Sequence, residues 1–160
     1  MKVTSSIFFA SLLLCFASCS SSDDNEEKDM EKPVIEESQD PNKANPIPCQ
    51  IYNRGDVIPF RYVFTDNDEL GNFNIEIHNN FDHHTHGTAS VDCPLDEKKK
   101  PVNPWVYNQD YPIPSGLKTY DAKTEIQIPK DIDPGDYHFM IRVTDKAGWQ
   151  QIAAISIKVK

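Results

Sequence analysis

Apolar residues recur at every second position along several short segments, and this periodicity limits the fold more than any other feature of the sequence. A period of two places apolar side chains on one face of a strand and polar ones on the other. Such strands are typical of antiparallel sheets buried on one side. The sequence shows no apolar stripe with a 3.6-residue period, so we expect almost no helix. The alternating apolar positions are Ile58, Phe60, Tyr62 and Phe64; Phe73, Ile75 and Ile77; Ile126 and Ile128; Tyr137, Phe139, Ile141 and Val143; and Ala153, Ile155, Ile157 and Val159.

The segments between these runs predict how the strands are joined. Val34-Ile35 predicts a first edge strand, and residues 145–148 (Asp-Lys-Ala-Gly) predict a hairpin turn with Gly148 in the left-handed conformation. Residues 133–137 resemble the tyrosine corner of immunoglobulin-like domains, in which a tyrosine hydroxyl bonds back to nearby backbone. We therefore predict an all-β fold, an immunoglobulin-like or fibronectin-like antiparallel β-sandwich of about seven strands.

One long segment does not fit this pattern. Residues 79–118 show no clean strand periodicity and contain five prolines. A connection of about 40 residues is well outside the usual range, and such loops are often functional. Because the segment also contains Trp105, Tyr107, Tyr111 and Cys93, we expect one long loop that packs against the sandwich.

The N-terminal residues resemble a lipoprotein export signal. Lys2 precedes a short apolar run, and residues 16–19 (Phe-Ala-Ser-Cys) resemble a lipobox in which Cys19 is acylated. Cys15 is the competing lipidation site, and a plain secretory signal is the other alternative. We expect a signal peptide over residues 1–18, an acidic disordered tether over 19–31 and one folded domain over 32–160. This organisation predicts an outer-membrane lipoprotein of the cell envelope, exposed at the surface, or alternatively facing the periplasm.

Two cysteines remain after the signal and the lipidated residue are set aside. Cys49 and Cys93 form an even pair in an oxidising compartment. We expect a disulfide between them, and two free thiols are the alternative.

Histidines are concentrated in one place. Four of the five lie within nine residues, at His78, His83, His84 and His86. Imidazole is the commonest side-chain ligand for zinc and copper, and the carboxylate of Asp82 adds an oxygen donor. We therefore expect Zn²⁺ or Cu²⁺ to bind here, and a solvated loop without a metal is the alternative.

The fifth histidine is distant in sequence but is predicted to join this group. In an immunoglobulin-like topology the strand that ends at His78 pairs antiparallel with the strand that begins at His138. Both histidines lie on the polar faces of their strands. The end of one strand then lies beside the start of the other, so all five histidines should meet at one end of the sandwich.

These residues resemble a known family. The segments 74–87 (NIEIHNNFDHHTHG) and 137–149 (YHFMIRVTDKAGW), together with the lipobox, are similar to the Bacteroidetes lipoprotein family labelled domain of unknown function 4625. The resemblance covers roughly residues 32–160, and the histidine segment is its most specific part. It implies location and architecture, since the family has no established activity.

Three classes of function compete. The leading hypothesis is a lipid-anchored metal-binding module that captures, buffers or delivers zinc or copper, with an outer-membrane transporter or a surface ligand as partner. The second is an adhesion or carbohydrate-binding accessory domain, in which Trp105, Tyr107 and Tyr111 form a stacking platform. We expect no enzymatic activity, because no HExxH spacing and no Ser/His/Asp or Cys/His signature is present. The net charge of −9 argues against nucleic acid as a partner.

Overall fold

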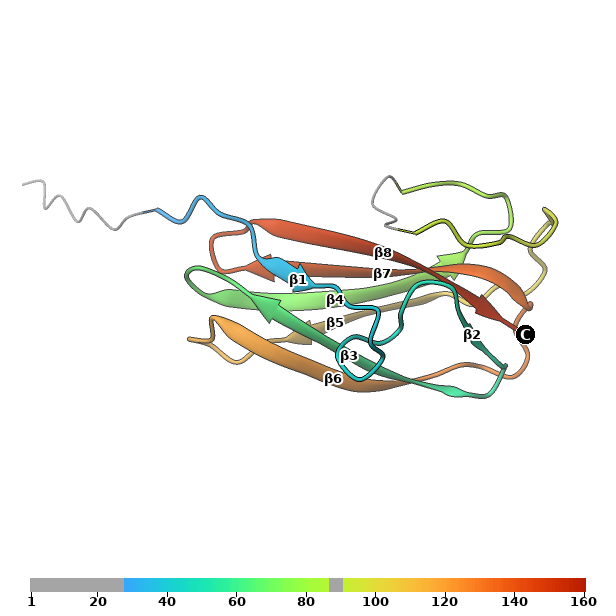
Figure 1. Ribbon diagram of the computed structural model, residues 1–160, viewed down its shortest axis with the longest axis horizontal. Coiled ribbons are helices and arrows are strands. Elements are labelled where there is room, and N and C mark those ends of the chain that lie inside the picture. Colours follow the sequence, from blue (N-terminus) through green and yellow to red (C-terminus); the bar gives the residue numbers. More distant parts are fainter. Residues whose placement is uncertain (1–27, 87–90) are drawn as a thin grey trace, which may run out of the picture.

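The computed structural model describes residues 28–86 and 91–160, which form strands and loops (Figure 1). The predicted signal peptide, Cys19 and most of the predicted tether lie outside these residues. No helix long and apolar enough to cross a membrane occurs in the part of the chain that the structure describes. The eight strands are β1 (Val34–Glu36), β2 (Gln50–Tyr52), β3 (Val57–Thr65), β4 (Leu70–Asn79), β5 (Tyr107–Pro112), β6 (Thr119–Gln127), β7 (Gly135–Asp145) and β8 (Gln150–Val159).

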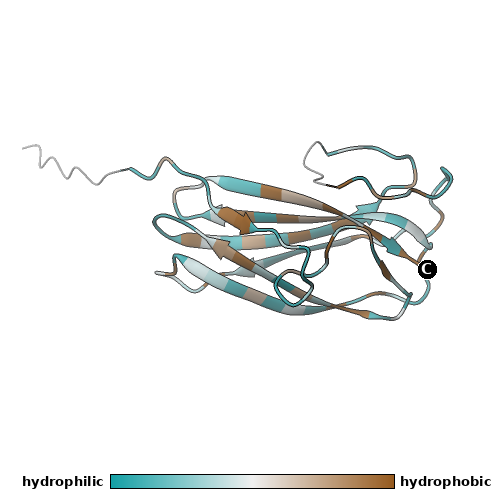
Figure 2. Ribbon diagram, viewed as in Figure 1, coloured by the Kyte–Doolittle hydropathy of each residue, from teal (hydrophilic) through white to brown (hydrophobic). Residues whose placement is uncertain are grey.

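The strands form two sheets packed face to face, so the predicted all-β sandwich is confirmed. The smaller sheet has the order β1-β3-β6 and the larger one the order β2-β8-β7-β4-β5. All neighbours pair antiparallel except the short β2, which runs parallel to β8. Figure 2 shows apolar and polar residues alternating along the long strands, and it is the apolar set that lies between the sheets.

The core is built from the alternating residues that the sequence predicts. Phe60 of β3 is 2% exposed and stacks on Phe73 of β4 and Phe139 of β7, with ring centroids 5.8 and 5.9 Å apart. These contacts cross from one sheet to the other. Burial of apolar area at roughly 25 cal/mol per Å² drives the sheets together, and offset aromatic pairs add to it.

Both predicted turns are present. The Tyr137 hydroxyl donates a hydrogen bond to the Asp133 carbonyl at 2.6 Å, as a tyrosine corner requires. The same hydroxyl accepts from the Trp105 backbone N–H at 3.2 Å. Gly148 has φ 96°, and the Asp145 carboxylate accepts hydrogen bonds from the N–H groups of Gly148 and Trp149. The tyrosine corner thus fixes the start of β7, and the Asp145 cap fixes its end.

The prediction of a single long loop over residues 79–118 is wrong in part, because β5 lies inside it. β5 is an edge strand that pairs only with β4, and its residues Asn108, Gln109 and Asp110 are exposed. An edge strand with little buried surface needs no apolar alternation, so the periodicity that identifies the other strands is missing here. The short β2 also lacks an alternation of apolar and polar residues long enough to identify it.

The predicted disulfide between Cys49 and Cys93 is confirmed. It ties the segment before β2 to the chain that follows the histidine-rich loop, across a sequence separation of 44 residues. Closing a loop of this length stabilises the fold by about 4 kcal/mol in the chain-entropy model. The bond therefore helps to hold residues 91–96 against the sandwich.

Candidate metal centre

Strand pairing brings the two distant histidines together, as the sequence predicts. His78 near the end of β4 lies directly opposite His138 near the start of β7 in the antiparallel register. Their ring centroids are 5.5 Å apart. The pair forms a rigid base for the site, because it stands on two central strands of the larger sheet.

A tight turn folds the rest of the histidine segment back over this base. The Asn80 N–H donates to the Asp136 carbonyl at 2.8 Å, and the His83 N–H donates to the Asn80 carbonyl at 3.2 Å. His83 itself takes a positive φ of 62°. The reversal places the rings of His84 and His86 5.4 and 5.0 Å from that of His78.

Three imidazoles converge through the same ring atom. His78 Nε2 lies 3.0 Å from His86 Nε2 and 3.3 Å from His84 Nε2. Donor atoms of all three residues lie within 4.8 Å of one another. Three nitrogens bound to one tetrahedral zinc ion at 2.0–2.1 Å would lie about 3.3 Å apart. The observed spacing fits a common ion.

Carboxylates lie beside the Nδ1 atoms of two of the three rings. Asp82 Oδ1 accepts from His84 Nδ1 at 2.6 Å, which leaves Nε2 of His84 with its lone pair, and this contact lowers the pKa of Asp82. Glu76 Oε1 lies 3.1 Å from His78 Nδ1, close enough for an ion pair although not aligned as a hydrogen bond. Two Nε2 lone pairs facing each other at 3.3 Å repel unless a proton or metal ion lies between them.

Asp82 therefore orients His84, a candidate ligand, and does not itself lie among the converging donor atoms, contrary to the sequence expectation that it supplies an oxygen ligand. Glu76 has the corresponding position at His78. The sequence contains a signal for that role, because Glu76 and His78 are two residues apart on β4 and share a face. A metal-bound imidazole is commonly held in this way by a carboxylate on its other nitrogen.

His138 lies beside the triad and is buried, with 4% of its surface exposed. Its Nε2 donates to the His84 carbonyl at 3.1 Å, while its Nδ1 is enclosed and has no partner. Burial lowers the pKa of His138 to about 4. Burial also lowers the pKa of His86, and the nearby His78 and His84 lower it further. Both rings are thus kept neutral near pH 7, the form that binds metals.

His83 is the exception to the expectation that all five histidines meet. Its Nε2 donates to the Asp96 carbonyl at 2.9 Å, and it does not belong to the converging group. It lines the edge of a cavity of about 110 Å³ whose wall also includes His84, His86 and His138. His83 thus fastens the loop to residues 91–96, while His78, His84 and His86 surround the candidate metal position.

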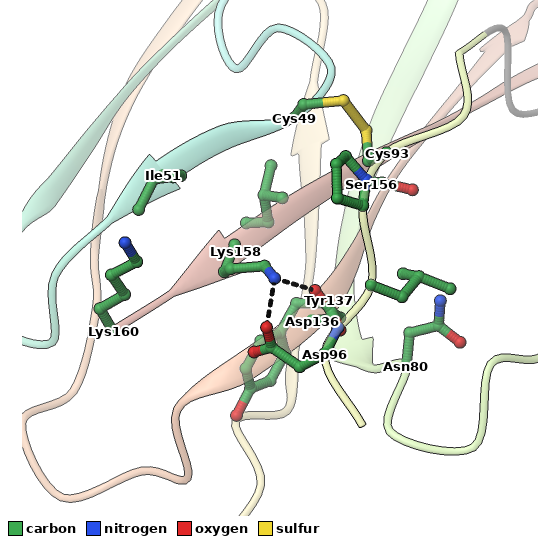
Figure 3. Close-up of a pocket in the computed structure, with 13 residues that line it drawn as sticks. Cys49, Ile51, Asn80, Cys93, Asp96, Asp136, Tyr137, Ser156, Lys158 and Lys160 are labelled. Carbon is green, nitrogen blue, oxygen red and sulfur yellow. Dashed lines mark hydrogen bonds and ion pairs between the residues drawn. A yellow bond between two sulfur atoms is a disulfide. The ribbon is translucent and has the colours of Figure 1, made fainter. Parts of the chain in front are cut away.

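A second, larger cavity shares part of its lining with the first, including Cys93 and Ser156 (Figure 3). It has a volume of about 350 Å³ and is bordered by the Cys49–Cys93 disulfide. Lys158 spans its wall and pairs with Asp96 at 2.6 Å and with the buried Asp136 at 3.2 Å, as the dashed lines in Figure 3 show. Asp136 also accepts the Asp96 N–H at 2.7 Å. These contacts hold Asp96, and through it His83, in place.

The aromatic platform expected for a carbohydrate-binding role is not formed. Trp105 is 4% exposed and packs in the core near Tyr137. Tyr111 stacks on Phe73 at 4.8 Å, and its hydroxyl lies 2.6 Å from that of Tyr107. Because Trp105 is buried, these three side chains cannot offer a common stacking surface to a sugar.

Fold and site together define a β-sandwich domain with a three-histidine cluster at one end. The chain belongs to the family described as Domain of unknown function (DUF4625), whose model matches residues 17–160. A search of curated proteins found no match to this chain. The family match over residues 17–160 confirms the resemblance seen in the sequence.

Proposed function

We propose that this protein is a lipid-anchored, cell-envelope module that binds zinc or copper through His78, His84 and His86. It captures or buffers the ion, or passes it to an outer-membrane transporter. The observation that carries the proposal is the convergence of three Nε2 atoms, 3.0 and 3.3 Å apart where measured from His78. Acylation of Cys19, inferred from residues 16–19, supplies the anchor.

The donor set supports a borderline metal. Neutral imidazole nitrogens suit Zn²⁺ and Cu²⁺, whereas Ca²⁺ and Mg²⁺ prefer oxygen ligands. A thiolate-rich site is ruled out for Cys49 and Cys93, because the two are joined in a disulfide. The affinity order favours copper, and supply often favours zinc.

The arrangement also supports exchange of the ion. His86 is exposed and His84 is half-buried, so one side of the triad faces solvent. Three histidines leave one position of a tetrahedral ion for a further donor, such as water or a group from a partner. A site of this kind can release its ion without unfolding. We assign it no catalytic step.

Metal content and affinity test the proposal directly. We expect elemental analysis of protein purified without a histidine tag to find zinc or copper at close to one ion per chain. Isothermal titration at pH 7.5 should give a dissociation constant tighter than about 10 µM for one of the two. Binding weaker than this for both metals would contradict the proposal.

A matched pair of variants then locates the site. His84→Ala combined with His86→Ala should remove most of the affinity, because two of three ligands are lost. Thr85→Ala is the control, since it changes an exposed residue of the same loop that offers no converging donor atom, and it should leave the affinity unchanged. Equal affinity in the double variant and the unchanged protein would place the metal elsewhere.

A further inference from the structure

Three aspartates from separate parts of the chain meet at the end of the sandwich opposite the histidines. Asp29 lies in the segment that enters the domain, Asp66 follows β3, and Asp145 ends β7. In Figure 1 this is the end where the chain comes in and where β7 turns into β8. One carboxylate oxygen from each lies within 4.8 Å of the others.

Each carboxylate uses its Oδ1 atom to cap local backbone. Asp145 Oδ1 accepts the N–H groups of Gly148 and Trp149 at 2.6 and 2.8 Å. Asp66 Oδ1 accepts from Asp68 N–H at 2.9 Å, and Asp29 Oδ1 accepts from Glu31 N–H at 3.0 Å. The three side chains are therefore fixed in orientation before any ligand is considered.

The second oxygens of two of these groups have no partner. Asp145 is only 4% exposed, yet its Oδ2 is enclosed and accepts no hydrogen bond. Asp66 Oδ2 is enclosed and unpartnered in the same way. Such atoms are rare in folded proteins, because a buried acceptor without a partner costs about 1–3 kcal/mol. Two of them in residues of one carboxylate cluster indicate that a ligand completes the group.

The charge of the cluster is also uncompensated. Within the described residues, no lysine or arginine nitrogen lies within 4.0 Å of these carboxylates. The nearest basic residue along the hairpin, Lys146, faces Glu69 instead. Burial raises the pKa of Asp145, and the negative charges of Asp66 and Asp29 raise it as well. A cation is the ligand that such a group attracts.

We propose that Asp29, Asp66 and Asp145 bind a hard divalent cation, with Ca²⁺ as the preferred ion. Oxygen-only donors suit Ca²⁺ and Mg²⁺ over Zn²⁺ and Cu²⁺. Ca²⁺ accepts irregular sets of six to eight oxygens, whereas Mg²⁺ needs a nearly ideal octahedron. Three carboxylates contributed by three separate segments, with waters filling the remaining positions, fit the more permissive ion.

The ion would join the entering chain to the folded domain. Asp29 also accepts the Asn67 side-chain N–H at 2.9 Å, and its carbonyl accepts the Trp149 indole N–H at 3.1 Å. These two contacts connect Asp29 to the β3–β4 turn and to the β7–β8 hairpin even without an ion. A cation shared with Asp66 and Asp145 adds a charged connection at the same point, so Ca²⁺ would fix where the tether leaves the sandwich.

Calcium titration of the purified chain tests this proposal. We expect Ca²⁺ to bind with a dissociation constant between about 10 µM and 1 mM, the range of extracellular modules and weak sensors. Ca²⁺ should raise the Tm, and Mg²⁺ should do so less at equal concentration. The absence of both heat and Tm change at several millimolar Ca²⁺ would overturn the proposal.

Neutral isosteres locate the site. Asp66→Asn and Asp29→Asn should each weaken Ca²⁺ binding at least tenfold, and Asp145→Asn should do the same where it folds. Asp68→Asn is the control, since it makes the same charge change in the same turn at an exposed residue outside the cluster. Wild-type affinity in Asp66→Asn and Asp29→Asn would overturn the proposal. Zinc affinity should be unchanged in all of them, which separates this site from the histidine site.

Discussion

The two ends of the sandwich gather polar groups of opposite kinds. At one end three imidazoles meet, and carboxylates lie beside the Nδ1 atoms of two of them, His84 and His78. At the other end three carboxylates meet, and backbone N–H groups stand behind them on their Oδ1 atoms. At both ends, supporting contacts hold several of these groups in place while donor atoms from all three residues lie within 4.8 Å of one another.

The difference lies in how the chain reaches each end. The histidine end combines one paired position, His78 and His138, with a single loop that folds back over it. The aspartate end combines three chain segments that are 37 and 79 residues apart in sequence, at positions 29, 66 and 145. A cluster within one loop is visible in the sequence, whereas a cluster assembled by the topology is not.

Breaking the disulfide should have the largest effect, and it should affect the two ends unequally. Replacing Cys49 and Cys93 by serine should lower the free energy of unfolding by about 4 kcal/mol, measured by urea denaturation. Because Cys93 lies in the wall of the histidine cavity, zinc affinity should fall as well. Calcium affinity should not change, since the aspartates lie at the other end. Equal zinc affinity with and without the disulfide would show that contacts such as His83 to Asp96 suffice to hold the loop.

Acid should also distinguish the ends, in opposite directions. The folded-state pKa of His138 is about 4, below its value of 6.5 in the unfolded chain. Between those values the unfolded state binds a proton that the folded state does not, so stability falls as the pH drops from about 6.5 to 4. The loss should reach at most about 3 kcal/mol. The folded-state pKa of Asp145 is raised, so the folded state binds a proton more readily than the unfolded one. The contribution of Asp145 to the free energy of unfolding therefore becomes more favourable as the pH falls.

The measurement is urea denaturation in EDTA at several pH values, with His138→Gln as the comparison. Glutamine keeps an N–H donor that can reach the His84 carbonyl but does not titrate. The difference in unfolding free energy between the two proteins should therefore shrink or reverse as the pH falls from 7 to 4. A constant difference would show that His138 titrates normally.

Most of the fold and part of the histidine site can be predicted from the sequence. Alternation identifies the strands that bury one face, and antiparallel pairing then places His138 beside His78. The same reasoning misses β5, whose exposed Asn108, Gln109 and Asp110 carry no apolar period. Edge strands are decided by hydrogen bonding to a neighbour and not by their own burial.

The positions of loop side chains are the second feature that the sequence does not predict. The positive φ at His83 turns its ring toward Asp96 and returns His84 and His86 to the triad. That conformation depends on the contact of Asn80 with Asp136, which the sequence does not reveal. The aspartate cluster is hidden from the sequence because it depends on contacts between distant segments. Asp66 follows the end of β3 and Asp145 ends β7, but the sequence does not show that these strand ends meet Asp29.

The smallest expected effect tests the supporting carboxylate at the histidine end. Asp82→Asn keeps an oxygen that can accept from His84 Nδ1 but removes its charge, so zinc affinity should fall about tenfold. Asp131→Asn, at an exposed position in the loop between β6 and β7, removes the same charge without touching a histidine and should leave zinc affinity unchanged. Titration calorimetry at one ionic strength compares them, because long-range charge effects are screened equally in both. If both variants lose affinity equally, the effect is general electrostatics, and Asp82 does not act through His84.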